Sequence, residues 1–354
     1  FCKPLESEHD IYGAGHASTS ISAGVGFAVA RDLKGEKYQV VSVIGDGALT
    51  GGLSFEGLNN LGSLRSRMLI ILNDNEMSIS PNVGAMSKYL SKITTNPLYN
   101  RVRDEIWHIT GKLPLGMKTI RTGIKKIEES LKNLLVPGVI FDEMGIRYFG
   151  PIDGNDLPLL ISTLENIKDI NSPTILHIIT KKGMGFAQAE ANPIKFHGIG
   201  PAAKPGQKPD SKAVPPFLEI FGNELSKLAD KEKRIVAVTA AMREGTGLSG
   251  FAAQHPDRFY DVGIAEGHAV TFAGALASQG MKPFVAIYST FLQRAYDMLV
   301  HDIAVQKLPV IFMLDRAGLV GEDGPTHHGV LDLSYLSSIP GVVVAAPRNG
   351  EELR

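Results

Sequence analysis

Two oxygen-bearing side chains follow adjacent apolar runs in the N-terminal half of the chain. Asp46 stands in "GDG" after the run "VVSVI", and Asn75 follows the run "MLIIL" in "NDNEMSIS". Parallel strands bring their carboxyl ends to one edge of a sheet, where ligands bind, so we expect the two side chains to lie side by side. Carboxylate, amide and main-chain carbonyl oxygens are hard ligands that suit Mg²⁺ bridged to a diphosphate. The pattern predicts a magnesium site formed by Asp46, Asn75 and the carbonyl of Met77.

The glycines beside Asp46 allow two interpretations. Gly-Asp-Gly suits a simple turn, because glycine adopts positive φ freely, and such a turn needs no ligand. In the second interpretation, Gly45 and Gly47 let the backbone approach a phosphate, and a helix beginning near Leu53 directs its N–H groups at it. The asparagine about thirty residues later favours the second, since this spacing resembles the diphosphate–magnesium motif of thiamine-diphosphate enzymes.

Alternating strands and helices are predicted to carry these residues. The continuous apolar runs expected to form strands are residues 38–47, 67–75, 173–180, 234–240, 258–264, 282–289, 308–315 and 341–347. The segments with helical spacing are residues 18–35, 53–64, 217–230, 265–280 and 290–307. Continuous apolar strands between helices predict an α/β fold with parallel sheets covered on both faces. The pattern fails between residues 81 and 121, which we expect to be irregular and either functional or mobile.

The chain is long enough for two domains. A stretch with five prolines and clustered glycines and lysines, residues 195–216, predicts a semi-rigid linker. We therefore expect one α/β domain over residues 1–194 and a second over residues 217–354.

Charge and composition exclude several classes of function. The formal net charge of −1 gives no electrostatic basis for binding nucleic acid or an anionic membrane. No apolar run approaches the roughly 18 residues that a membrane span needs. Cys2 is the only cysteine, so we expect no disulfide framework and a reducing compartment.

Several segments in both halves resemble one enzyme family. "GAGHASTSISAGVGFAVA", "GDGALTGG", "NDNEMSIS", "DVGIAEGHAV", "YSTFLQRAYD" and "DRAGLVGEDGPTHHGVLDLSYL" resemble, in this order, the 1-deoxy-D-xylulose-5-phosphate synthase family, which is related to transketolase. The resemblance implies a diphosphate-binding and then a pyrimidine-binding domain, with thiamine diphosphate and Mg²⁺ as cofactors. It also implies a reaction: pyruvate is decarboxylated and condensed with D-glyceraldehyde 3-phosphate, giving 1-deoxy-D-xylulose 5-phosphate and CO₂. This is the first step of the non-mevalonate isoprenoid pathway, and it feeds thiamine synthesis.

The resemblance assigns roles to individual residues. Glu266 would hydrogen-bond N1′ of the aminopyrimidine, Phe291 would stack on that ring, and His16 would lie beside the thiazolium and diphosphate. Further cofactor contacts would come from Ala17, Ser18, Gly47, Ala48, Asn75, Lys182 and Phe186. The residues implied for substrates are Tyr288, Arg294, Arg316, Asp323 and His327, with His16, Asp323 and His327 also catalytic.

Four of these residues also have a purely structural interpretation. Glutamate at a helix start often only complements the helix dipole, and an aromatic such as Phe291 often only packs in a core. Arg294 and Arg316 would otherwise be surface charges, although the guanidinium fork suits an acceptor's phosphate.

The chain departs from the family pattern in three respects. Gly267 stands where the family usually has glutamine, and Phe186 where it often has tyrosine. The family's N-terminal segment, with further active-site histidines, and its C-terminal domain are not in this sequence. We therefore expect the 354-residue chain by itself to be nearly inactive.

The resemblance further implies a homodimer, located in a bacterial cytoplasm or, after transit-peptide removal, in the plastid stroma. Two other functions stay open. A transketolase would move two-carbon ketol units between sugar phosphates, and a non-catalytic module would bind the cofactor without reacting. CO₂ release from pyruvate separates the synthase from the transketolase.

Overall fold

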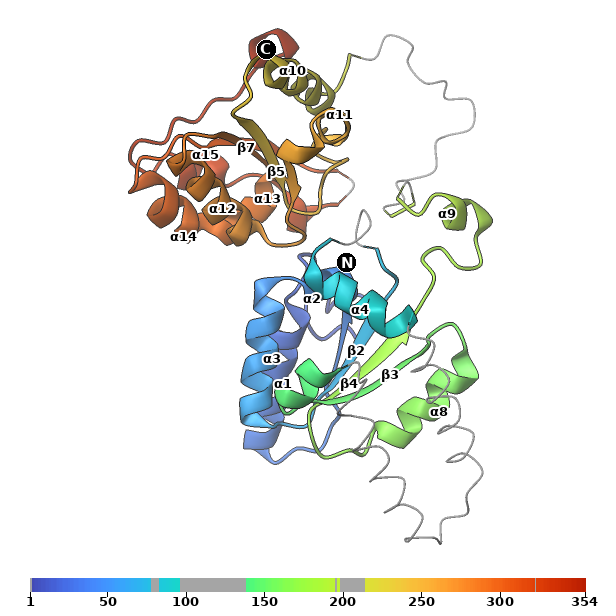
Figure 1. The fold of residues 1–354 in the computed structure, drawn as a ribbon. Helices are drawn as coiled ribbons and strands as arrows, with labels where there is room; N and C mark the ends of the chain where they lie inside the picture. The colour runs from blue at the N-terminus through green and yellow to red at the C-terminus, as the bar shows by residue number, and fades with distance from the viewer. Residues whose placement is uncertain (1, 78–82, 96–137, 195, 198–213, 322) are drawn as a thin grey trace, which may run out of the picture. The chain divides into compact units, whose positions relative to one another are not determined.

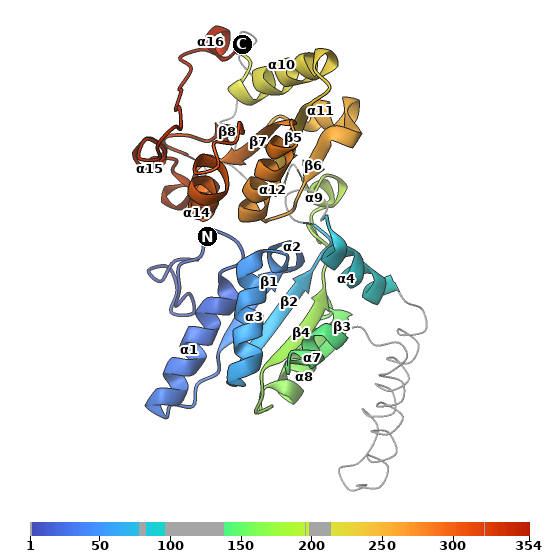
Figure 2. The ribbon, with the colours of Figure 1, turned by 60° about the vertical axis from the view of Figure 1, so that its left-hand side comes forward.

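The protein folds into two compact units, each with its own parallel sheet (Figures 1 and 2). The computed structural model describes residues 2–77, 83–95, 138–194, 196–197, 214–321 and 323–354. The first unit comprises Ser18–Glu76 and Gly84–Lys182, and the second comprises Phe1–Ala17, Met77–Val83 and Gly183–Arg354. The predicted linker at residues 195–216 lies mostly outside the described residues, so the predicted domain boundaries stay predictions.

The first unit is built on a sheet of order β1-β2-β4-β3, in which every pair is parallel. Its strands are β1 (Val41–Gly45), β2 (Leu69–Asp74), β3 (Arg147–Asp153) and β4 (Thr174–Ile179). Its helices are α1 (Ser20–Lys34), α2 (Asp46–Leu49), α3 (Gly52–Leu64), α4 (Ala85–Thr95), α7 (Val139–Glu143) and α8 (Leu157–Ile167).

Alternate residues of β2 face two separate cores. Ile70 and Leu72 pack in a core with residues of α1 and α3, which run side by side along the sheet (Figure 2). Leu69 and Ile71 point the other way and pack in a second core with residues of α8. The parallel sheet is therefore covered on both faces, as the apolar runs predict.

The second unit repeats this design with the sheet order β6-β5-β7-β8, again all parallel. Its strands are β5 (Ile235–Thr239), β6 (Phe259–Asp261), β7 (Lys282–Tyr288) and β8 (Ile311–Asp315). Its helices are α9 (Ala187–Ala191), α10 (Phe217–Lys231), α11 (Ser249–Gln254), η1 (Pro256–Arg258), α12 (Glu266–Ser278), α13 (Ser289–Leu292), η2 (Gln293–Ala295), α14 (Tyr296–Met298), η3 (Leu299–Ala304), η4 (Pro325–His327), α15 (Asp332–Leu336) and α16 (Gly350–Leu353).

Two cores fill the second unit, one on each face of its sheet. Residues of α10 and α11 pack on one face, and residues of α12, α15 and the α13–η3 segment pack on the other (Figure 1). In the part of the chain that the structure describes, no helix is long and apolar enough to cross a membrane.

Three of the predicted segments differ in the structure. Ala85–Thr95 is a helix, α4, although residues 81–121 were expected to be irregular; residues 81–82 and 96–121 lie outside the description. Residues 341–347 are not a strand, because none of the described strands pairs with them, and Val343 is 91% exposed. The helix expected over residues 290–307 is divided into α13, η2, α14 and the π-helical turn η3.

Strand β3 was not predicted, because its own sequence does not have the pattern of a strand. β3 contains Gly150 and Pro151, and its register against β4 shifts between Phe149 and Ile152. Proline lacks the N–H that a ladder needs, and glycine weakens a strand, so the sequence "RYFGPID" does not read as one.

A close approach between α3 and the end of α7 requires glycine at position 62. A Cβ added to Gly62 would lie 2.0 Å from the main-chain oxygen of Met144, whereas one added to Gly26 of α1 would meet nothing within 4 Å. Both glycines lie inside helices, so the same substitution isolates the packing effect.

We expect Gly62→Ala to destabilise the protein and Gly26→Ala to stabilise it. Overpacking against main chain costs about 1–3 kcal/mol, and replacing an exposed helix glycine by alanine contributes about 0.5–1 kcal/mol. Urea unfolding followed by circular dichroism measures both. A Gly62→Ala protein as stable as Gly26→Ala would contradict this packing.

Candidate functional site

Asp46 and Asp74 lie next to each other at the carboxyl ends of β1 and β2. β1 ends at Gly45, Asp46 opens α2, and Gly45 pairs with Asn73, so the register sets Asp46 beside Asp74. The two carboxyl groups are hydrogen-bonded, and only 4% of Asp46 and 2% of Asp74 is exposed. Asn75, the residue expected beside Asp46, follows one position later and is half-buried.

Asp74 has further partners that were not predicted from the sequence. Its Oδ2 accepts a hydrogen bond from His177 Nε2 (3.0 Å), and its Oδ1 accepts one from the Glu76 N–H (3.0 Å). Burial raises the pKa of Asp74, but the hydrogen bonds with His177 and Asp46 outweigh it and hold that pKa below its usual value. The only signal in the sequence is a lone histidine inside the apolar strand "TILHII".

Four other predicted cofactor residues gather around Asp46 in the first unit. The Ser18 hydroxyl donates to the Ala48 carbonyl (2.7 Å), and Gly47 lies in the same short helix, α2. Ser18 has φ +75°, a strained conformation of the kind that clusters at functional sites. Burial lowers the pKa of Lys182, and the charge of Asp46 acts in the opposite direction, so this amine lies within electrostatic reach of Asp46.

The carboxyl groups of Asp46 and Asp74 fit a divalent cation. Two buried carboxyl groups in contact repel each other when both are charged, and a cation or a shared proton is needed to hold them together. Oxygen ligands at a strand end are what Mg²⁺ prefers.

His16 is the centre of a second cluster, in the second unit. Its Nε2 donates to the Thr326 carbonyl (2.7 Å), and the Thr290 hydroxyl lies 3.2 Å from the same nitrogen. Its ring stands edge-on to Phe291 and His327, with centroids 5.0 and 5.3 Å apart. The three rings were predicted from the sequence, whereas the two threonines, which neighbour them in the chain, were not.

Glu266 begins α12 and is 6% exposed. Burial raises the pKa of its carboxyl, and the nearby Arg294, with Nη1 3.7 Å from Glu266 Oε2, offsets part of this rise. Arg294 Nη2 also donates to the Ala17 carbonyl, so this arginine connects the glutamate to the segment that carries His16. A carboxyl with a raised pKa is suited to donating a proton to a ring nitrogen.

The glycine that follows Glu266 has a packing explanation. A Cβ at Gly267 would lie 3.2 Å from Met298 Cε, a contact tighter than ordinary van der Waals packing. A side chain at this position requires the end of Met298 to shift by a few tenths of an ångström.

Arg316 is fixed over the ring of Tyr288. Its guanidinium carbon lies 4.2 Å from the ring centroid, and Nη1 donates to Asp315 Oδ1 (2.6 Å) and the Gly245 carbonyl (2.7 Å). Burial raises the pKa of Tyr288 to about 12, so its hydroxyl stays protonated. Arg294 and Arg316 thus contact different residues, and their joint role on a phosphate stays a prediction.

The remaining predicted residues are less closely connected. Asp323 is exposed, but its charge acts on both Tyr288 and His327. Phe186 is half-exposed and packs edge-on against Phe196, with centroids 5.5 Å apart. Met77 belongs to the second unit, whereas Asp46 and Asn75 belong to the first, so the set of three metal ligands stays a prediction.

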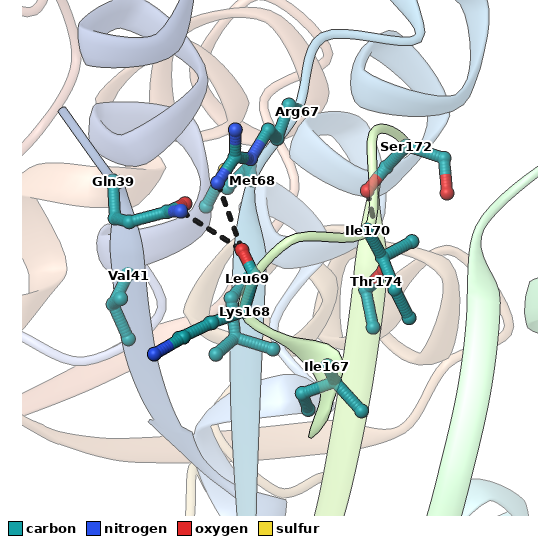
Figure 3. A pocket seen from close by; sticks show the side chains of 10 residues that line it. All are labelled: Gln39, Val41, Arg67, Met68, Leu69, Ile167, Lys168, Ile170, Ser172 and Thr174. Carbon is teal, nitrogen blue, oxygen red and sulfur yellow. Dashed lines mark hydrogen bonds between the residues drawn. The ribbon is translucent and has the colours of Figure 1, made fainter. Parts of the chain in front are cut away.

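A pocket in the first unit lies at the other end of its sheet (Figure 3). It is lined by the first residues of three strands, Val41, Leu69 and Thr174, far along the strands from Asp46 and Asp74. Gln39 and Arg67 both donate to the Lys168 carbonyl (2.8 Å each), at the end of α8 (Figure 3). These two side chains satisfy a carbonyl at the C-terminus of α8. The pocket therefore has a structural explanation, and it lies away from the predicted site.

Comparison with known proteins covers almost the whole chain. Residues 1–180 match the family model described as 1-deoxy-D-xylulose-5-phosphate synthase, and residues 215–354 match the transketolase pyrimidine binding domain. A 1-deoxy-D-xylulose-5-phosphate synthase of Pelotomaculum thermopropionicum is 52% identical over 355 residues, covering 100% of this chain and 56% of that protein. The corresponding protein of Aquifex aeolicus is 54% identical over 360 residues, with 100% and 56% covered. The chain thus spans little more than half the length of these relatives.

We expect His327 to titrate below the usual histidine range. Burial lowers the pKa of His327 below the model-peptide value of 6.5, and this outweighs the opposite effect of the Asp323 charge. As the pH falls, the unfolded chain therefore protonates this histidine before the folded protein does. The contribution of His327 to stability is present above pH 6.5 and is lost as the pH falls towards the lower pKa of the folded protein.

NMR of histidine Cε1–H resonances against pH tests this, with His327→Gln identifying the signal. A midpoint at or above 6.5 for that signal would contradict the burial of this imidazole.

Proposed function

The chain belongs to the 1-deoxy-D-xylulose-5-phosphate synthase family, and we propose the family's reaction for the protein. It decarboxylates pyruvate and joins the remaining two carbons to D-glyceraldehyde 3-phosphate, forming 1-deoxy-D-xylulose 5-phosphate and CO₂ with thiamine diphosphate and Mg²⁺. The observation that carries this proposal is Glu266, a buried carboxyl of raised pKa at the start of a helix in the pyrimidine-binding region.

Thiamine diphosphate, when bound, supplies a carbon nucleophile for the pyruvate ketone. Glu266 would share a proton with N1′ of the aminopyrimidine, and Phe291 would present a ring face to that heterocycle. Asp46, Asn75 and the Met77 carbonyl would hold Mg²⁺. The remaining contacts to the diphosphate and thiazolium come from His16, Ala17, Ser18, Gly47, Ala48, Lys182 and Phe186.

The substrates are bound by side chains of the second unit. Arg316, which is fixed over Tyr288 but a third exposed, binds the phosphate of the acceptor together with Arg294. His327 is neutral at pH 7, because burial lowers its pKa, and so accepts a proton from the substrate hydroxyl or returns one. Asp323 lies within electrostatic reach of both His327 and Tyr288.

Pyruvate decarboxylation, measured with and without D-glyceraldehyde 3-phosphate on the full-length protein, tests the proposal. The synthase releases one CO₂ for each 1-deoxy-D-xylulose 5-phosphate identified by NMR. Ketol transfer between sugar phosphates without CO₂ would instead identify a transketolase. Tight cofactor binding without exchange of the cofactor's C2 proton would identify a non-catalytic module.

We also propose a homodimer in a bacterial cytoplasm or the plastid stroma; the bacterial relatives favour the former. Large apolar side chains exposed between positions 319 and 333 are consistent with a contact surface; these are Leu319, Val330, Leu331 and Leu333. Light scattering that gives the mass of one chain would refute the dimer.

Glu266→Gln should separate activation of the cofactor from its binding. The amide keeps the size of the side chain but cannot transfer the proton, so C2–H exchange of thiamine diphosphate in deuterium oxide should slow by about 10²–10⁴-fold. The dissociation constant should change by less than about tenfold, since the metal and the diphosphate contacts remain.

Glu219→Gln is the matched control, because Glu219 is also acidic in the first turn of a helix but is exposed. If both substitutions had equal effects on C2–H exchange, Glu266 would only complement the helix dipole.

Arg316→Ala should raise the KM for D-glyceraldehyde 3-phosphate by about tenfold or more, because a charge-assisted bidentate contact is lost. The KM for pyruvate and the rate with unphosphorylated glyceraldehyde should stay near those of the wild type. Arg348→Ala, which removes an exposed arginine, is the control. An equal loss with both aldehydes would show that Arg316 supports the structure and does not bind the phosphate.

A further inference from the structure

Four polar side chains form a hydrogen-bonded row across the sheet of the first unit. In strand order they are Asp46 after β1, Asp74 of β2, His177 of β4 and Tyr148 of β3. Asp46 bonds to Asp74, His177 Nε2 lies 3.0 Å from Asp74 Oδ2, and the Tyr148 hydroxyl lies 2.6 Å from His177 Nδ1. The row spans all four strands of this sheet and reaches the predicted metal ligand at one end.

The row lies in an otherwise apolar layer. Residues two positions before its members, Ile44, Leu72 and Ile175, belong to the core on this face, and His177 is 0% exposed. Polar groups buried in such a layer cost free energy unless each is hydrogen-bonded, and well-packed apolar residues are often at least as stable. The stability of the fold therefore does not explain why polar side chains occupy these positions.

The hydrogen bonds leave His177 a single orientation. A carboxylate only accepts, so Nε2 carries the hydrogen and donates it to Asp74, while Nδ1 is bonded to the phenol. Tyr148 is held in turn by a parallel stack on Phe141, with centroids 5.8 Å apart. Asp74 is thus fixed by His177, by the Glu76 N–H and by Asp46.

We propose that Tyr148 and His177 are positioning residues that hold Asp74 and, through it, orient the Asp46 carboxylate for Mg²⁺. This inference rests on the proposed function, because it takes Asp46 as a metal ligand. Partners behind the direct ligands fix a ligand's orientation, and their loss typically weakens metal affinity by about 10–100-fold. A row kept only for structure would affect stability and leave metal affinity unchanged.

The test uses the full-length protein and two measurements. The first is the Mg²⁺ dissociation constant, from the Mg²⁺ dependence of thiamine-diphosphate binding in calorimetry. The second is the Tm without metal or cofactor. The variants are His177→Leu, His177→Gln, whose amide nitrogen still donates to Asp74, and Tyr148→Phe, which removes one oxygen. Thr163→Val is the control, because Thr163 is also buried and hydrogen-bonded but lies on α8.

We expect His177→Leu to raise the Mg²⁺ dissociation constant by about 10–100-fold and His177→Gln to recover most of that loss. Tyr148→Phe should raise it by about fivefold, the effect of one hydrogen bond. Thr163→Val should lower only the Tm.

Mg²⁺ dissociation constants within twofold of the wild type in His177→Leu and Tyr148→Phe would overturn the inference and leave the proposed function standing. If His177→Leu does not fold, Tyr148→Phe decides by the same criterion. Cofactor binding by the wild type that needs no Mg²⁺ would overturn the metal site, and with it both proposals.

Discussion

The contact between two buried carboxyl groups, Asp46 and Asp74, is the feature on which the first unit depends. Such a pair is unfavourable inside a protein unless a proton, a cation or several hydrogen bonds compensate. The parallel sheet creates the contact by aligning the ends of β1 and β2. The His177 and Glu76 N–H groups then hold Asp74 in place. The sheet, its register and the polar row are therefore all arranged around one strand end.

The second unit has the same sheet architecture, but the pKa of its buried carboxyl group is shifted in the opposite direction. Hydrogen bonds hold the pKa of Asp74 low and keep it charged, whereas burial raises the pKa of Glu266 and favours its protonated form. The charge of Arg294 limits this rise in the pKa of Glu266, with Nη1 3.7 Å from Glu266 Oε2. A charged carboxyl suits a metal, and a protonated one suits a ring nitrogen. The two roles proposed for the cofactor site thus follow from different local environments in similar sheets.

Most of the fold could be predicted from local patterns, because apolar runs and helical spacing are local properties of the sequence. Gly35, with φ +68°, ends α1 where the pattern places a stop. β3 could not be predicted, because Gly150 and Pro151 interrupt its pattern and only pairing with β4 makes it a strand. His177 and Asp74 are 103 residues apart, so no local signal identifies their contact. Sequence patterns identified the residues with reactive groups, and the structure added the partners that orient them.

Thermal unfolding of the wild type and Asp46→Asn, each with and without Mg²⁺ and thiamine diphosphate, tests whether the buried Asp46–Asp74 pair serves a cation. Without ligands the Asp46–Asp74 pair needs a shared proton to relieve its repulsion, whereas the amide of Asp46→Asn donates to Asp74 at any pH. If the pair is kept for the sake of a cation, this substitution should leave the Tm without ligands at least as high as that of the wild type. The same substitution should abolish the increase in Tm that Mg²⁺ and the cofactor give the wild type. A variant that is less stable without ligands and still gains the full increase with them would contradict the claim.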